Sequence, residues 1–261
     1  MAGATRFEQM LYTGARRIKD GAVLFVGFHW PMVMTRIARR LHAPNIVVVY
    51  ENGIVEDRIT SVLPTSPCDL TAAENATTCV GSLESLFMWL NAGRVEMTLL
   101  EAAIVDRYGN INTTAVGPYR KPKVRLPGSG GGTELASFGR DLFLVSSSAN
   151  PRSYPERVDY ITSPGYLNGA AERASLGYKR DRGPKTLVNP LGIFRFDENG
   201  EMVACAVHAG VTPENVRAGF GWPIKIDANY DTLPEPSAEE LAVIRRELAH
   251  AKERFYSLPE A

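Results

Sequence analysis

Two hydrophobic patterns alternate along the first fifty residues. Residues 5–19 and the segment that follows Pro31 place apolar side chains at helical spacing, whereas residues 22–27 and 45–50 are short, continuous apolar runs typical of buried strands. The apolar positions that recur in the two helical segments are Phe7, Leu11, Ile18, Ile37 and Leu41. The order helix, strand, helix, strand predicts an α/β fold, with a parallel sheet and crossover helices.

The rest of the chain continues this alternation less regularly. Residues 54–79 are rich in Pro, Thr and Asp, which predicts a surface excursion. Helices are predicted at residues 83–91, 133–138 and 237–254. The last helix begins with Ser237 and Glu240, which are spaced as a capping box. Strands are predicted at residues 97–105, 142–146, 158–162, 193–197 and 202–207, the last two as a hairpin. No repeat, low-complexity tract or linker interrupts the chain, so we expect a single domain over residues 1–261.

Composition and charge exclude two classes of partner. Of the 261 residues, 44% are hydrophobic and 22% are charged, as is ordinary for a protein with a sizeable core. Lys plus Arg and Asp plus Glu both number 29, so the formal net charge is zero, and we expect no nucleic acid and no membrane as a partner. Because a near-neutral charge does little to oppose association, it favours a subunit of a larger assembly.

The cysteines, histidines and apolar runs indicate a cytoplasmic protein without a metal. Cys68, Cys79 and Cys205 show no CxxC spacing, as expected of unpaired thiols in a reducing cytosol. The four histidines have no metal-ligand spacing. The first residues lack the apolar core of a signal peptide, and no apolar run approaches the roughly 20 residues that span a bilayer. We therefore expect a soluble, cytoplasmic protein with no metal site.

The tripeptide Glu51-Asn52-Gly53 follows directly on the apolar strand of residues 45–50. A carboxylate at the end of a buried strand lies where the rim of an open α/β sheet usually carries its site, so Glu51 is a candidate nucleophile or base. The alternative is a turn in which Asn52 and Gly53 tolerate positive φ and Glu51 is solvated. On these three residues alone, the turn is the favoured interpretation.

A second feature is the run Gly128-Ser129-Gly130-Gly131-Gly132, just before a short predicted helix. Glycines let the backbone approach a ligand and direct several N–H groups at one point, which suits a phosphate or an oxyanion. The run lacks the ending of a P-loop and the spacing of a dinucleotide fingerprint. A flexible surface loop is an equally good interpretation.

Two polar segments accompany these motifs. In residues 106–114 the Asn and Thr side chains are expected to hydrogen-bond loop backbone, and they could order active-site loops from behind. Phe28-His29-Trp30-Pro31 ends the first strand, at the same rim as Glu51. His29 is a candidate for proton transfer. A packed histidine in the wall of a pocket is the favoured alternative.

Several segments of the chain together resemble the beta subunits of glutaconate CoA-transferases, which are family I CoA-transferases. The resemblance covers nearly the whole chain and lies in the order and spacing of the segments rather than in one motif. The matching segments are residues 49–53, 106–114, 128–131, 158–165, 191–197 and 211–216.

The resemblance implies a mechanism and a set of site residues. In the family, a glutamate at the position of Glu51 attacks the acyl-CoA thioester, and an enzyme-bound glutamyl-CoA thioester follows. The N–H groups of Ser129 and Gly130 match the donors that stabilise the oxyanion. The remaining residues assigned to substrate or CoA binding are Asn52, Gly53, Gly128, Gly131, His29 and Trp30.

The resemblance also implies the fold and the partners. The implied fold is an open, mostly parallel sheet with flanking helices, shared by CoA-transferases and ribose-phosphate isomerase-like proteins. Coenzyme A and the acyl-CoA are substrates rather than permanently bound cofactors, and a carboxylic acid accepts the CoA. Family members are hetero-oligomers, so the implied partner is a CoA-transferase alpha subunit.

One departure from the family pattern leaves alternatives open. The stretch Phe28-His29-Trp30 is bulkier than expected for glutaconate transferases, which argues for a different acyl group if these side chains face the pocket. The second hypothesis is a CoA-thioester hydrolase or carbon–carbon lyase, for example one that opens the ring of a cyclic acyl-CoA. Relatives of that kind lack the glutamate present here as Glu51, which favours the transferase. A third hypothesis makes the chain a non-catalytic binding or assembly subunit.

Overall fold

The first fifty residues fold as their hydrophobic pattern predicts. In the computed structural model, which describes residues 3–179 and 181–255, they form α1 (Arg6–Arg16), β1 (Val23–Val26), α2 (Trp30–Leu41) and β2 (Val47–Val49). A capping box formed by Thr5 begins α1. The strands β1 and β2 are parallel neighbours, as expected for a crossover through α2.

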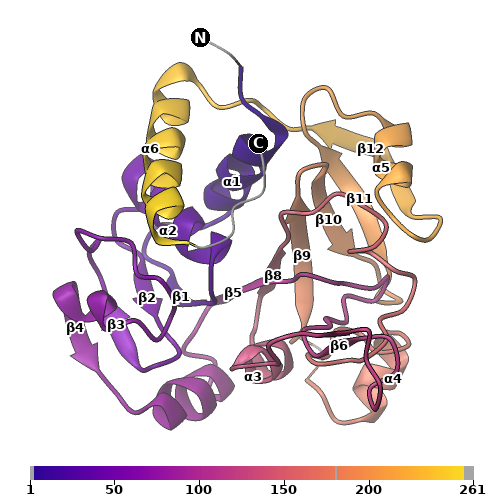
Figure 1. Cartoon of the computed structure of the whole chain (residues 1–261), viewed down its shortest axis with the longest axis horizontal. Helices are drawn as coiled ribbons and strands as arrows, with labels where there is room; N and C mark the ends of the chain where they lie inside the picture. The colour runs from indigo at the N-terminus through magenta and orange to yellow at the C-terminus, as the bar shows by residue number, and fades with distance from the viewer. Residues whose placement is uncertain (1–2, 180, 256–261) are drawn as a thin grey trace.

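Ten strands make one mixed sheet, which Figure 1 shows with its flanking helices. The strands beyond β1 and β2 are β3 (Ile54–Glu56), β4 (Ala76–Cys79), β5 (Met97–Glu101), β8 (Leu142–Val145), β9 (Pro184–Asn189), β10 (Gly192–Phe196), β11 (Met202–Val207) and β12 (Lys225–Thr232). Their order is β12-β11-β10-β9-β8-β5-β1-β2-β3-β4, and the five central strands from β9 to β2 are all parallel. The predicted open, mostly parallel α/β sheet is confirmed.

Two of the sequence-based assignments are wrong. Residues 54–79 are not only a surface excursion, because they contribute β3 and β4, which extend the sheet by antiparallel pairing. Residues 158–162 form no strand, and the only ladder contact nearby is a single bridge between Ile111 and Ser163. The place beside β8 belongs to β9, whose first residue is Pro184. Proline usually breaks a strand but is tolerated at its first residue.

Helices cover both faces of the sheet. The helices α1, α2 and α6 (Ala238–Arg254) are grouped on one face, and α3 (Gly132–Phe138) lies on the other with the helical turn η2 (Glu84–Trp89) (Figure 1). Side chains alternate along β1, so Leu24 and Val26 join the core under the first group while Phe25 joins the core under the second. No helix in the described part of the chain combines the length and apolar character needed to cross a membrane.

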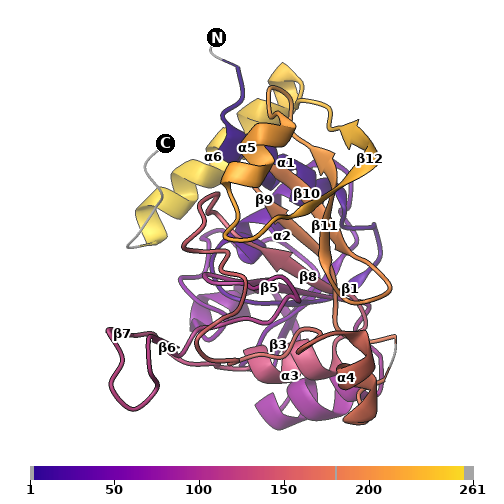
Figure 2. The ribbon, with the colours of Figure 1, turned by 90° about the vertical axis from the view of Figure 1, so that its right-hand side faces the viewer.

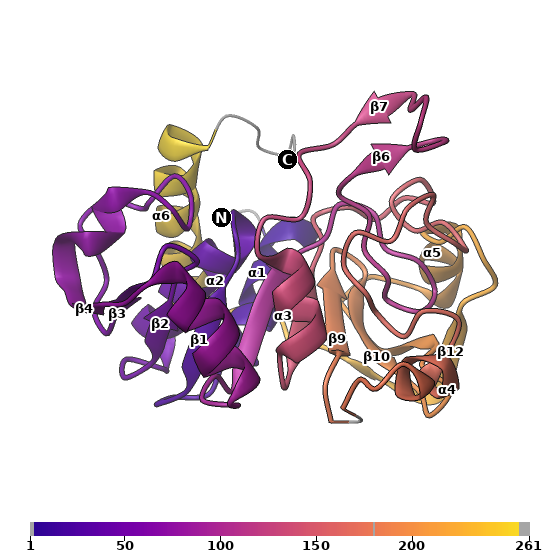
Figure 3. The same ribbon diagram turned by 90° about the horizontal axis from the view of Figure 1, so that it is seen from below.

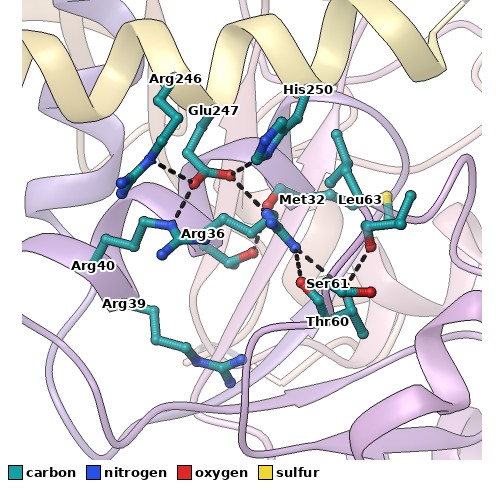
Figure 4. A network of polar contacts seen from close by, with 12 residues as sticks. Met32, Arg36, Arg39, Arg40, Thr60, Ser61, Leu63, Arg246, Glu247 and His250 are labelled. Carbon is teal, nitrogen blue, oxygen red and sulfur yellow. Dashed lines mark hydrogen bonds and ion pairs between the residues drawn. The ribbon is translucent and has the colours of Figure 1, made fainter.

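The C-terminal helix α6 is held to α2 by a network around a buried carboxylate (Figure 4). Glu247 accepts hydrogen bonds from Arg36 Nε at 2.7 Å and from Arg40 Nε, and Arg36 Nη1 also donates to the carbonyl of Thr60 at 3.0 Å. Burial raises the pKa of Glu247, but the hydrogen bonds and charges of the two arginines outweigh it, and the pKa lies below its ordinary value. The capping box predicted at Ser237 is present.

The remaining elements lie outside the central layers. The short strands β6 (Ala115–Val116) and β7 (Val124–Arg125) form a separate hairpin that extends away from the sheet (Figures 2 and 3). The predicted hairpin of residues 193–207 is confirmed as β10 and β11. The helices α4 (Ala170–Ser175) and α5 (Pro213–Ala218) complete the described chain.

Candidate active site

The carboxyl ends of the parallel strands bring the candidate residues to one edge of the sheet. His29 follows β1, Glu51 follows β2, and Glu101 ends β5. Because β2, β1 and β5 are adjacent in the sheet, these three side chains begin on neighbouring strands. Ligands of open α/β sheets bind at this edge, beyond the strand ends.

Glu51 stands at the second position of the tight turn Tyr50–Gly53, which joins β2 to β3. The N–H of Gly53 donates to the carbonyl of Tyr50 at 3.0 Å, and the side-chain oxygen of Asn52 accepts from the N–H of Ile54 at 3.0 Å. Gly53 has φ +88°, and a Cβ there would lie 1.9 Å from the carbonyl oxygen of Val80, so only glycine fits. The turn is therefore present, with the expected positive φ at Gly53 but not at Asn52, and it presents Glu51.

A buried cluster anchors the base of this turn. Tyr50 is almost fully buried, and Arg39 Nη1 donates to Glu56 at 3.0 Å. Burial raises the pKa of Glu56, and the charge of Arg39 offsets part of that effect. Burial and the Glu56 charge both raise the pKa of Tyr50, so its hydroxyl stays protonated. The backbone before Glu51 is thus held by packing and paired charge.

The glycine-rich loop lies directly against the Glu51 carboxylate, although about eighty residues separate them in the chain. A Cβ built on Gly131 would lie 3.3 Å from Glu51 Cδ, and one on Gly130 would lie 3.4 Å from Glu51 Oε1. Gly130 also has φ +48°. The loop's lack of side chains therefore lets its backbone approach the carboxylate, as the second sequence motif suggested.

The loop carries three consecutive backbone N–H groups that make no hydrogen bond to the described residues. The N–H of Gly128 donates to the carbonyl of Thr113 at 2.7 Å, and that of Gly132 donates to the carbonyl of Ser129 at 2.8 Å. Within residues 3–179 and 181–255, the N–H groups of Ser129, Gly130 and Gly131 have no acceptor. No group in these ranges donates a hydrogen bond to the Glu51 carboxylate either. Both sides of this contact are free to bind a substrate.

The segment of residues 106–114 orders the loops around the site. The side chain of Asp106 accepts from the N–H groups of Tyr108 and Asn110 at 3.0 Å each. Asn110 in turn accepts from the N–H of Gly165 at 2.9 Å. The expected role of these polar side chains, hydrogen bonding to loop backbone, is confirmed. Through Thr113, the same segment reaches the glycine-rich loop.

A cavity of about 550 Å³ adjoins the glycine-rich loop on the side of β1 and β5. Its lining residues are Phe28, His29, Leu100, Glu101, Ala103, Ile111, Thr113, Pro127, Gly128, Ser129, Gly132, Ser147 and Ser163. Glu51 does not line the cavity. It lies against Gly130 and Gly131, the part of the loop that does not line the cavity either. The loop is therefore shared by the carboxylate and the cavity.

His29 reaches the cavity, but Trp30 is packed in the core. His29 Nδ1 lies 2.8 Å from Glu101 Oε2, whereas Trp30 is fully buried with its ring edge-on to Phe7. The binding role assigned to Trp30 stays a prediction. Glu101 was missed in the sequence, where it lies inside the segment predicted as one long strand. Glu101 would have been a candidate if the predicted strand had been ended at this residue, because β5 ends there next to β1.

The other candidate nucleophile near the turn is a thiol. Burial, and then the charge of Glu51, raise the pKa of Cys68, so the thiol stays protonated and is a weak nucleophile. In the part of the chain that the structure describes, no three His, Cys, Asp or Glu side chains gather in a way that could hold a metal ion. Glu51 is the carboxylate that lies against the glycine-rich loop.

Comparisons with known proteins agree with this geometry. A family model described as coenzyme A transferase matches residues 7–219. The chain is 37% identical over 246 residues to the B subunit of 3-oxoadipate CoA-transferase from Pseudomonas knackmussii, covering 94% of each protein. It is 29% identical over 250 residues to the B subunit of glutaconate CoA-transferase from Acidaminococcus fermentans, covering 94% of this chain and 92% of that one. The crystal structure of glutaconate coenzyme A-transferase from the same organism superposes with a TM-score of 0.86 over 94% of both chains.

Proposed function

The chain belongs to the coenzyme A transferase family, and from that premise we propose that it is a B subunit in which Glu51 carries CoA as a covalent thioester. The observation that carries the proposal is the contact between the Glu51 carboxylate and Gly130 and Gly131, beside three unused backbone N–H groups. A nucleophile next to preorganised donors is the arrangement that acyl transfer needs.

The proposed reaction divides one exchange into two halves. A Glu51 carboxylate oxygen attacks the thioester carbonyl carbon, the carbon–sulfur bond breaks, and CoA leaves as a thiolate while Glu51 holds the acyl group as a mixed anhydride. The thiolate then attacks Glu51 Cδ, which releases the acyl group as a carboxylate and leaves a glutamyl-CoA thioester. An acceptor carboxylate takes the CoA through the same steps in reverse.

The glycine-rich loop supplies the oxyanion donors in this proposal. Each attack produces a tetrahedral oxyanion, and backbone N–H groups stabilise such charge without having to reorganise. We assign this role to the N–H groups of Ser129 and Gly130, which have no acceptor within the described residues. Gly128 and Gly131 allow the loop to approach the bound CoA thioester.

The proposal includes a partner subunit and a class of acid. The two relatives are named as B subunits, so we propose an A-type subunit as partner. That subunit would cover Glu51 and keep water from the anhydride. The relatives act on 3-oxoadipate and glutaconate by name, and we propose a dicarboxylic acid as a substrate here. CoA enters and leaves as a substrate rather than as a resident cofactor.

Trapping the covalent intermediate tests the proposal. The assembled complex is incubated with acyl-CoA and then with borohydride or hydroxylamine, and the peptide that contains Glu51 is analysed by mass spectrometry. We expect modification at Glu51 that depends on acyl-CoA, with none in a Glu51→Gln complex and none at Glu253, an exposed glutamate on α6. An active complex with unmodified Glu51 would refute the nucleophilic role.

The same samples distinguish the alternatives. A thioester hydrolase or lyase would release free CoA without an acceptor acid, and it would not exchange labelled acid into the thioester. A non-catalytic role would leave activity unchanged in the Glu51→Gln complex. The presence of Glu51 at the loop contact favours the transferase over both.

A further inference from the structure

The cavity beside the glycine-rich loop contains a hydrogen-bonded pair of side chains, His29 and Glu101, that the proposed transfer chemistry does not use. His29 Nδ1 and Glu101 Oε2 are 2.8 Å apart, and both residues line the cavity. The His29 side chain is 10% exposed, whereas the Glu101 side chain is 23% exposed. A carboxylate in this position accepts the Nδ1–H and leaves Nε2 as the nitrogen for other contacts.

His29 is held in a backbone conformation that costs energy. Its φ of +73° and ψ of −116° lie outside the regions that non-glycine residues favour, and Leu167 is the only other described non-glycine residue with positive φ. Such strain costs on the order of 1–3 kcal/mol and persists where the surroundings over-determine it. The surroundings here are the rings of Trp30 and Phe255, whose centroids lie 4.1 and 4.5 Å from that of the imidazole.

The lining of the cavity indicates what the pair faces. Most of the lining is apolar or carries a hydroxyl, and His29 is the only described lining residue that can become a cation. Within residues 3–179 and 181–255, no group hydrogen-bonds to His29 Nε2. When the ring is protonated, both nitrogens donate, one to Glu101 and one to a ligand. The cavity therefore suits a short apolar chain that bears an oxygen acceptor.

The pair also lies at a suitable position relative to Glu51. The strands β2, β1 and β5 are consecutive in the sheet, and neighbouring strands lie about 5 Å apart. Glu51 and the pair thus begin one to two strand spacings apart, and the glycine-rich loop contacts both the carboxylate and the cavity. An acyl chain of a few carbons joined at Glu51 spans that separation.

We infer that the His29–Glu101 pair selects the acyl group: His29 Nε2–H donates to a keto or carboxylate oxygen carried by the acyl chain beyond the thioester, and Glu101 is the positioning residue that holds the ring. This inference rests on the proposed CoA-transferase function and extends it to the substrate. A packed wall histidine, the competing explanation, would contribute shape but no preference for an oxygen.

The experiment compares matched acyl-CoA donors in the assembled complex. The panel is hexanoyl-CoA, its 3-oxo analogue and its analogue with a terminal carboxylate, with kcat and KM measured for each. In His29→Phe, which keeps a ring but removes both nitrogens, we expect KM for the oxygen-bearing donors to rise by about tenfold to a hundredfold. We expect kcat, and KM for hexanoyl-CoA, to change by less than threefold. Glu101→Gln should raise the same KM values by a smaller factor.

The controls separate this inference from both folding and the proposed function. His42→Phe replaces a histidine at the other end of α2, where Nε2 contacts the carbonyl of Ile18, and should leave the preference unchanged. Loss confined to the 3-oxo donor or to the carboxylate donor supports the inference and identifies the oxygen. Equal changes for all three donors, or none, would overturn it. If the unaltered complex transfers no CoA and Glu51 is not trapped, the proposed function fails instead.

Discussion

Two regions of the molecule each contain a glutamate, and the two carboxylates differ in their hydrogen bonding. At the α2–α6 interface, Glu247 is buried and accepts hydrogen bonds from Arg36 and Arg40 (Figure 4). At the edge of the sheet, Glu51 is half-buried and accepts none from the described residues. The first carboxylate is satisfied by the fold and stabilises it. The second has no protein partner among the described residues and lies next to backbone N–H groups that also lack one, an arrangement that suits the binding of a substrate rather than stability.

The largest effect on activity should come from replacing Glu51. In Glu51→Gln we expect CoA transfer by the assembled complex to fall at least about 10³-fold, because the proposed covalent route is lost. The free energy of unfolding should change by less than about 0.5 kcal/mol, since no interaction is removed. Steady-state kinetics and urea unfolding measure the two quantities, with Glu253→Gln as the control. If the Glu51→Gln chain were inactive because it is unfolded, Glu51 would be needed for stability, and the contrast with Glu247 would be wrong.

The next largest effect should come from replacing Glu247, and it should be a loss of stability rather than of activity. In Glu247→Leu, Arg36 keeps its buried position but loses its partner, and we expect a loss of about 3–5 kcal/mol in the free energy of unfolding. The double variant Arg36→Met, Glu247→Leu should recover much of that loss, because the buried charge of Arg36 is removed and the remaining arginine, Arg40, is partly exposed to solvent. Urea unfolding of both variants measures this. A single variant as stable as the unaltered chain would show that the network adds nothing.

Crowding the Glu51 carboxylate should reduce activity with little effect on stability. A Cβ on Gly131 would lie 3.0 Å from Leu86 Cδ2 and 3.3 Å from Glu51 Cδ, and φ there is −80°, so alanine is allowed by the backbone. We expect Gly131→Ala to lower kcat by about tenfold to a hundredfold through displacement of Glu51. Gly81→Ala is the matched control, because a Cβ there meets nothing within 4 Å. Equal kinetics for the two variants would contradict the proposed contact.

The smallest effect should be a change with pH in the contribution of Glu247 to the free energy of unfolding. Its pKa is lowered in the folded chain, so its contribution to stability is fully present above the ordinary pKa of a glutamate and is lost as pH falls through the lowered value. The difference in unfolding free energy between the unaltered chain and Glu247→Gln should therefore be constant near neutral pH and shrink in acid. Urea titrations from pH 7 to pH 3 measure this. A difference in unfolding free energy that grows as the pH falls would contradict the lowered pKa of Glu247.

The sequence predicted some parts of the fold better than others. The helices at residues 5–19 and 237–254 and the hairpin at residues 193–207 were correct, because their signals are local: helical spacing, a capping box, and the dipeptide Asn199-Gly200 between the two strands of the hairpin. The strand predicted at residues 158–162 was wrong because a short run of residues that favour strands does not show whether a neighbouring strand is available to pair with it. β9 was missed because Pro184 concealed its start.

The candidate site divides in the same way. The sequence alone determined that Glu51 ends a buried strand at a turn, and that residues 128–132 can bring backbone close to a ligand, since both depend on a few consecutive residues. Only the tertiary structure decided that these two segments touch and that His29 pairs with Glu101. Those contacts depend on the order of β2, β1, β5 and β8 in the sheet. That order is a property of the packed chain, because strands distant in sequence become neighbours only when their apolar faces share one core.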